Sequence, residues 1–125
     1  MGAVTFPDVE TMCVAFAQTR TTADVATKIA NPRPVRYARV WRTGGGAVNR
    51  VLERAQITVT CGSAVDDEDA SAIARELRHA FLNGYASMPL VRGVDEVVGP
   101  YFDPDPDTGE DRYTFTLQLL VRGKR

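Results

Sequence analysis

The sequence has little of what catalytic and metal sites are usually made from. Its 125 residues include one histidine, His79, and two cysteines, Cys13 and Cys61. One histidine with no cysteine nearby excludes the usual zinc spacings, and no serine lies in a G-x-S-x-G elbow. The glycines at 44–46 lack the Gly-Lys-Ser/Thr ending of a phosphate loop. We therefore expect that the protein is not an enzyme and binds no cofactor.

Long apolar runs are also missing, and we expect no leader segment. No apolar run approaches the roughly 20 residues of a membrane span. The first ten residues have no basic region followed by a hydrophobic one, so we expect no secretion signal, no membrane contact and folding in a cytosol. In that compartment Cys13 and Cys61 are expected to be buried small hydrophobic residues without a disulfide. The length predicts a single domain over residues 1–125.

Charge is nearly balanced in total but uneven along the chain. The net charge is −1, yet residues 1–55 carry eight basic and four acidic side chains, and residues 56–125 carry seven basic and twelve acidic ones. A domain polarised in this way can associate head to tail, with the basic part of one copy against the acidic part of the next.

The hydrophobic pattern predicts an α+β fold with the element order α-β-β-β-α-β-β. We expect a mostly antiparallel sheet of four or five strands with two helices packed on one face. Helices are predicted from Thr5 or Asp8 to about Arg20 and from Asp66 or Asp67 to Gly84. Strands are predicted near 25–29, 35–43, 56–61, 94–98 and 113–121. Between them we expect a long, mobile hairpin connection at 44–55 and an acidic, proline-rich loop at 99–111.

The second predicted strand is the most informative part of the chain. It carries arginines at every third position, beginning in the segment that precedes it: Arg33, Arg36, Arg39 and Arg42. Because side chains alternate along a strand, Arg36 and Arg42 should share one face, and Arg39 should lie on the other beside Tyr37 and Trp41. Arginine, tyrosine and tryptophan are enriched in protein interfaces. We expect this strand to contact another molecule, with the acidic C-terminal half of a second copy as its complement.

The charged segments are also compatible with two other functions, calcium binding and nucleic-acid binding. Asp103, Asp105 and Asp107 alternate as in the first half of a calcium loop, but Thr108 stands where that loop needs glycine and Thr114 where it needs glutamate. We therefore expect no metal site. The arginine strand could instead bind nucleic acid through phosphate contacts and stacking, although the pI of about 5.8 argues against it.

Three stretches, in this order and spacing, resemble the tail terminator (tail completion) proteins of long-tailed bacteriophages, in the form common in phages of actinobacteria. They are Asn31-Pro32-Arg33-Pro34 with Tyr37–Gly45; Gly99-Pro100 with Asp103-Pro104 and Gly109; and Arg112–Thr116 with Val121-Arg122-Gly123. With the order of elements, the likeness spans nearly the whole chain, from Asp8 to Gly123. One departure is Cys61-Gly62, which stands where similar chains often carry a bulkier cysteine–aromatic pair.

The resemblance implies a structural virion protein made in the host cytoplasm and located at the head-proximal end of the tail. Its subunits would form a hexameric ring that caps the tail-tube protein, stops tube growth and faces the head-side connector or stopper protein. DNA would pass through the bore without sequence-specific binding. Other head–tail neck proteins share this architecture and remain an alternative, as does a cytosolic nucleic-acid-binding module. The expected residues of the subunit or tube interface are Arg33, Arg36, Tyr37, Arg39, Trp41, Arg42, Arg50, Asp103, Asp105 and Asp107.

Overall fold

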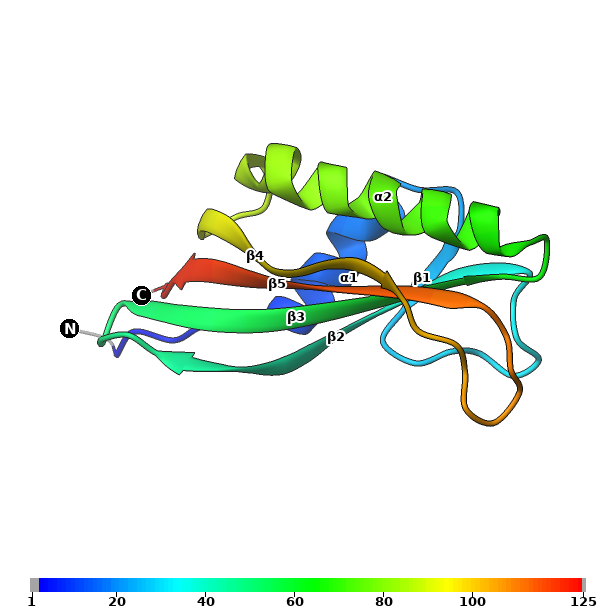
Figure 1. The fold of residues 1–125 in the computed structure, drawn as a ribbon. Coiled ribbons are helices and arrows are strands. Elements are labelled where there is room, and N and C mark those ends of the chain that lie inside the picture. The colour runs from blue at the N-terminus through cyan, green and yellow to red at the C-terminus, as the bar shows by residue number, and fades with distance from the viewer. Residues whose placement is uncertain (1–2, 125) are drawn as a thin grey trace.

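The computed structural model describes residues 3–124 and confirms the predicted α+β class and element order. Two helices cover one face of a five-stranded sheet, and Figure 1 shows α2 running along that face. The elements are α1 (Val9–Gln18), β1 (Asp24–Ala26), β2 (Arg36–Ala47), β3 (Leu52–Ser63), α2 (Asp67–Gly84), a short 3-10 turn (Tyr85–Ser87), β4 (Val91–Phe102) and β5 (Arg112–Arg122).

The strands lie in the order β1-β2-β3-β5-β4. β1 pairs with β2 in parallel, and all other neighbouring pairs are antiparallel. β4 and the short β1 are therefore the two edges of the sheet. Near the chain ends, Thr5 and Lys124 form an isolated antiparallel bridge, so the described N-terminal and C-terminal segments lie side by side.

The core lies between the sheet and the helices. Alternate residues of β3 and β5, such as Ile57, Val59, Phe115 and Leu117, are fully buried there against Phe81 and its neighbours on α2. Burial of this apolar surface is the main force that fixes both helices on one face.

Both cysteines are buried in this core and neither forms a disulfide, as predicted. Burial raises the pKa of the Cys13 thiol to about 12, and it also raises that of Cys61. Both thiols are therefore packing residues and not nucleophiles at neutral pH.

Side-chain caps start both helices. The carboxylate of Asp8 accepts the Thr11 backbone N–H at 3.1 Å, and that of Asp66 accepts the Asp69 N–H at 2.7 Å. These bonds satisfy donors that the first turn of a helix leaves free. The N-cap of the first helix is therefore Asp8 and not Thr5, and that of the second is Asp66 and not Asp67.

The long hairpin connection predicted at 44–55 is wrong. β2 continues to Ala47 and β3 begins at Leu52, which leaves a short turn held by the Asn49 side chain. The glycines extend the ladder because a register shift follows Arg42 and Gly45 adopts a φ of +97° that other residues rarely adopt. Here glycine marks a β-bulge within paired strands rather than a mobile tip.

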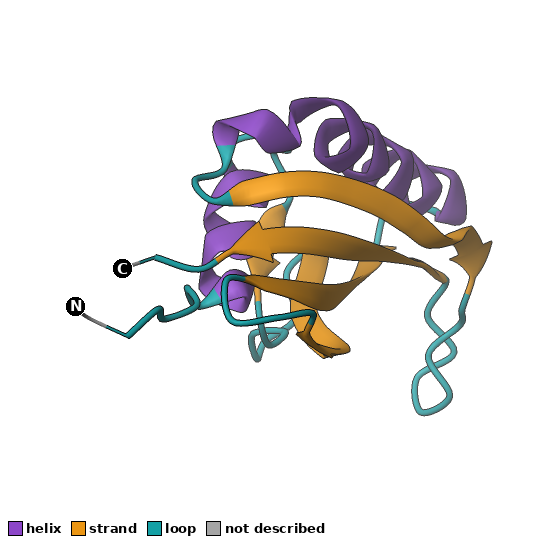
Figure 2. Ribbon diagram, turned by 90° about the vertical axis from the view of Figure 1, so that its left-hand side faces the viewer, coloured by secondary structure: helices purple, strands orange, loops and turns teal. Residues whose placement is uncertain are grey.

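The acidic loop is also shorter than predicted, because β4 extends to Phe102 and β5 begins at Arg112. The remaining loop, residues 103–111, hangs from one end of the sheet on the side away from α2 (Figures 1 and 2).

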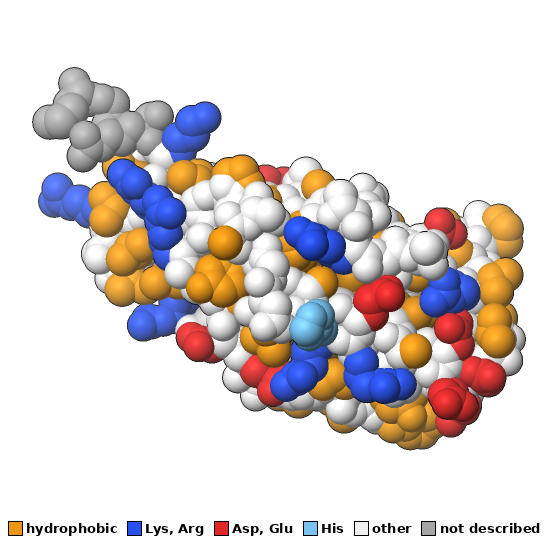
Figure 3. Space-filling view, turned by 90° about the horizontal axis from the view of Figure 1, so that it is seen from above, with side chains coloured by type: hydrophobic (Ala, Val, Ile, Leu, Met, Phe, Trp, Pro, Cys, Tyr) orange, Lys and Arg blue, Asp and Glu red, His pale blue; other side chains and the backbone are white. Residues whose placement is uncertain are grey.

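The sheet face opposite the helices is called the open face below. At its centre, threonines of neighbouring strands bond to one another: Thr58 to Thr43 at 2.9 Å and to Thr116 at 3.1 Å, and Thr60 to Thr114 at 3.1 Å. Cross-strand hydroxyl pairs of this kind stabilise a sheet without a covering layer. The helix-covered side presents basic and acidic side chains interspersed across its middle (Figure 3).

Candidate subunit interface

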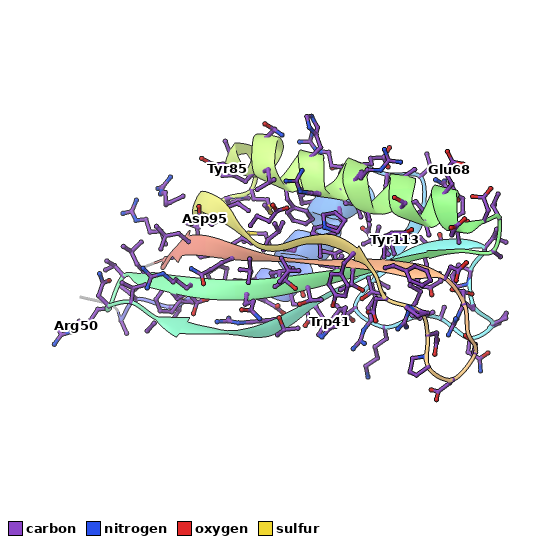
Figure 4. The ribbon with its side chains drawn as sticks, in the orientation of Figure 1. Trp41, Arg50, Glu68, Tyr85, Asp95 and Tyr113 are labelled. Atoms are coloured by element: carbon purple, nitrogen blue, oxygen red, sulfur yellow. The ribbon has the colours of Figure 1, made fainter. Side chains whose placement is uncertain are left out.

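The predicted division of the arginines between the two sheet faces is found in the structure. Arg36 and Arg42 lie on the helix-covered face, where Arg36 Nε donates to Asp69 of α2 and Arg42 Nη1 donates to Glu53 of β3. Arg39 lies on the open face with Tyr37 and Trp41, and Figure 4 shows Trp41 on the side of the sheet away from α2. The period of three therefore distributes cations to both faces of one strand.

Arg33 precedes β2 and bonds to the acidic loop of its own chain. Its guanidinium lies 3.1 Å from Asp105 Oδ2 and 3.2 Å from Glu110 Oε2. Asp105 is only 8% exposed, and its carboxylate also accepts the Asp107 backbone N–H at 2.9 Å. This N–H, together with Arg33, lowers the pKa of Asp105 to about 2.

Tyr37 joins the same group of side chains. Its hydroxyl donates to Glu110 Oε1 at 2.6 Å, and its ring lies 5.6 Å from the Arg33 guanidinium. Burial and the Glu110 carboxylate raise the pKa of the Tyr37 phenol. The ring occupies the space above Gly62, its cross-strand partner on β3. The space that a side chain at position 62 would take is therefore filled by an aromatic side chain from the neighbouring strand.

Arg112 completes the group at the start of β5. Its guanidinium lies 3.6 Å from Asp105 and 3.9 Å from Asp103, and the Asp103 carboxylate accepts the Thr114 hydroxyl at 2.8 Å. We call these residues the loop cluster: Arg33, Tyr37, Asp103, Asp105, Glu110 and Arg112. It ties the 27–35 segment and the acidic loop to one end of the sheet, while Asp107 stays exposed at the loop surface.

The arginines of the helix-covered face also have partners within the chain. Arg36 Nε lies 2.9 Å from Asp69, whose pKa the guanidinium lowers, and Arg36 Nη1 donates to Thr22 at 2.7 Å. Arg42 Nη1 lies 3.3 Å from Glu53. The acidic complement expected on another copy is thus present inside the chain for Arg33, Arg36 and Arg42.

Arg39 and Arg50 differ from these three. The Arg39 guanidinium lies 4.1 Å from the centre of the Trp41 ring and donates to the Thr27 carbonyl at 3.0 Å. Arg50 is exposed in the turn after β2, at the opposite end of the molecule from the acidic loop (Figure 4). Within residues 3–124 neither cation has a carboxylate partner. Among the predicted interface arginines, these two can therefore form an ion pair with a carboxylate of another molecule.

Sequence reasoning missed an apolar surface on the edge strand β4. Half of the large exposed hydrophobic side chains of residues 3–124 lie on this strand: Val97, Val98, Tyr101 and Phe102. The signal was present in the two adjacent apolar pairs, because neighbours in a strand point to opposite faces and both cannot enter one core. Exposed apolar side chains on an edge strand are candidates for contact with another molecule.

Side chains that could ligate a metal ion are not gathered in the described part of the chain. No group of three or more His, Cys, Asp or Glu side chains within residues 3–124 is placed to hold a metal ion. His79 is exposed on α2 beside Asn83. Among the described helices, none is long and apolar enough to cross a membrane.

Together, these side chains can supply stacking, ion pairing and apolar contact to a macromolecular partner. Arg39 and Trp41 supply stacking and ion pairing on the open face, and β4 supplies apolar contact at the edge.

A comparison of the chain with models of known protein families finds no match, and neither does a comparison with curated proteins.

Proposed function

We propose that this protein is a structural subunit of a long-tailed phage, a tail terminator. Its partners are further copies of itself in a hexameric ring, the tail-tube protein and the head-side connector or stopper protein, with DNA passing through the bore. In this role it caps the tube at the head-proximal end of the tail and stops its growth. The role requires contact surfaces and no catalytic group.

The observation that carries this proposal is the loop cluster. The first of the three stretches on which the sequence resemblance rests lies far along the chain from the other two, and each contributes to the cluster: Arg33 from the first, Asp103 from the second, Arg112 from the third. If these stretches carry the likeness because they serve one structural purpose, their residues should contact one another in the folded chain. The exposed apolar side chains of β4 and Arg39, which has no carboxylate partner within residues 3–124, add surface suited to assembly.

The proposal is tested with Arg39→Glu and Trp41→Ala in the phage that encodes the chain. Both side chains lie on the open face outside the core, so the subunit should fold normally. We expect phage particles with unjoined heads and tails, or with tubes of uncontrolled length, seen by electron microscopy. Arg75→Glu on the solvent side of α2 is the matched charge-reversal control and should leave assembly unchanged. Infectious particles of normal tail length from both open-face variants would contradict the assignment.

Two alternatives make different predictions. A neck protein on the head side would remain with purified heads, whereas a terminator remains with purified tails. A nucleic-acid-binding module is favoured by the Arg39–Trp41 stack and by exposed Arg54 and Arg122 on the same face. That alternative predicts a salt-dependent gel shift with single-stranded DNA that Trp41→Ala abolishes.

A further inference from the structure

Two features at opposite edges of the sheet match in chemistry, since one is an exposed aromatic side chain and the other a mostly apolar pocket. At the β4 edge, Tyr101 and Phe102 are 46% and 51% exposed. At the β1 edge, a pocket of about 110 Å³ lies between β1, β2 and the 27–35 segment. Its lining is mostly apolar and includes Ala26, Ile29 and Pro34. Lys28 also lines the pocket and supplies a positive charge. An exposed aromatic ring at one edge and an apolar pocket at the other form a knob and a hole on a single chain.

The register of the sheet places knob and hole at the same level. Tyr101 pairs with Thr114 of β5, which pairs with Thr60 of β3. Thr60 pairs with Arg39 of β2, and Arg39 pairs with Ala26, a lining residue of the pocket. One row across the open face therefore runs from Tyr101 at one edge to the pocket at the other. A second copy placed beside the first at the same height would bring its Tyr101 to this pocket.

The main chain at the two edges favours side-chain insertion over strand addition. On the pocket side, the Gln18 side chain donates to the Val25 carbonyl at 3.2 Å, and the Arg42 N–H donates to Glu10 at 3.0 Å. These bonds occupy edge groups that an added strand would need. On the other side, β4 has three register shifts, and Pro100 lacks an N–H. These features disfavour a regular hydrogen-bonded ladder between two copies. They leave room for the aromatic side chain of one copy to insert into the pocket of another.

We propose that the Tyr101 side chain of one copy inserts into the Ala26–Pro34 pocket of the next, with Val98 packing beside it. The contact buries an aromatic ring, the residue type that most often dominates binding energy, and brings it within reach of the Lys28 ammonium. Knob and hole are different patches, so the contact is heterologous and repeats from copy to copy. The contact between two copies does not depend on the proposed function. Only the closure of successive copies into a ring rests on that function.

The contact is tested by placing a photoreactive benzophenone amino acid at position 101 in place of tyrosine. Protein labelled with heavy isotopes is mixed with unlabelled protein and irradiated at high concentration. We expect cross-links that join two different copies and map to peptides covering residues 24–34. The same group at Val65, which is also exposed and lies just before α2, is the control and should give no such product. Cross-links only within one copy, to other segments, or none at all would overturn the proposal.

Paired variants test whether the contact is heterologous. Tyr101→Ala removes the knob and Ala26→Trp fills the hole, and both positions are exposed, so folding should persist in each. Each variant alone should self-associate at least about tenfold more weakly than the wild type, as expected for the loss of an aromatic anchor. Mixed together, they should form dimers and nothing larger, because each retains one intact patch. Unchanged association of both variants would overturn the contact.

The outcomes separate this contact from the proposed function. Cross-links at residues 24–34 in a protein that never caps tail tubes would support the contact and refute the terminator role. Tubes capped by rings whose cross-links map elsewhere would refute the contact and support the role.

Discussion

Gly62→Ala is expected to destabilise the fold, because Tyr37 occupies the space that a side chain at position 62 would need. A Cβ at Gly62 would overlap the end of the Tyr37 ring, with Cε1 at 2.7 Å. The ring cannot move away freely, since Tyr37 is 2% exposed and its hydroxyl is bonded to Glu110 at 2.6 Å. Either the overlap remains, at about 1–3 kcal/mol, or the ring shifts and loses a charged hydrogen bond of about 1.5–3 kcal/mol.

We therefore expect Gly62→Ala to lower the free energy of unfolding by about 2–3 kcal/mol, measured by urea denaturation. For a chain of this length that corresponds to a Tm lower by roughly 8–12 °C. Gly93→Ala in β4 is the matched control, because a Cβ there meets nothing within 4 Å. Its effect should be neutral or slightly stabilising.

A double-mutant cycle identifies Tyr37 as the cause. Tyr37→Ala removes the ring, so adding Gly62→Ala to that variant should cost little, and the two substitutions should be strongly non-additive. If Gly62→Ala costs as much without the ring as with it, or costs nothing in the wild-type background, the account of this strand pair is refuted.

Two further predictions concern the β2–β3 turn and the acidic loop. Gly45→Ala should cost more than about 1 kcal/mol in urea denaturation, because its φ is +97° and a Cβ would overlap the Arg54 carbonyl; Gly46→Ala, with open space around it, should be neutral. Equal effects of the two would refute the bulge. For Asp105, the folded-state pKa of about 2 lies below the unfolded value near 3.9, so the carboxylate stabilises the fold fully above about pH 4 and this contribution is lost as the pH falls towards 2. Asp105→Asn should therefore reduce stability at pH 7 and flatten its decline below pH 4; an unchanged acid profile would contradict this.

The regular elements could be predicted because their signals are local. Alternation in Tyr113–Val121 predicts β5, and capping residues limit the helix starts to Thr5 or Asp8 and to Asp66 or Asp67, of which the structure has Asp8 and Asp66. The alternation of side chains also placed Arg36 and Arg39 on opposite faces.

The features that were missed depend on contacts between distant parts of the chain. The glycines of β2 form a strand only because β3 pairs with them through a bulge. Arg33 meets Asp105 only because β2 and β5 both lie beside β3, which brings the two loops to one end of the sheet. The composition shows that the two halves of the sequence carry opposite net charge. It does not show that Arg33, Arg36 and Arg42 pair with carboxylates of the same chain.

The central claim is tested most directly by assembling tail-tube protein with and without this protein and examining the products by electron microscopy. The account predicts a closed ring with an open bore at one end of each tube, and no further growth from that end. Tubes that grow equally long from both ends in the presence of this protein, with no ring attached, would contradict it.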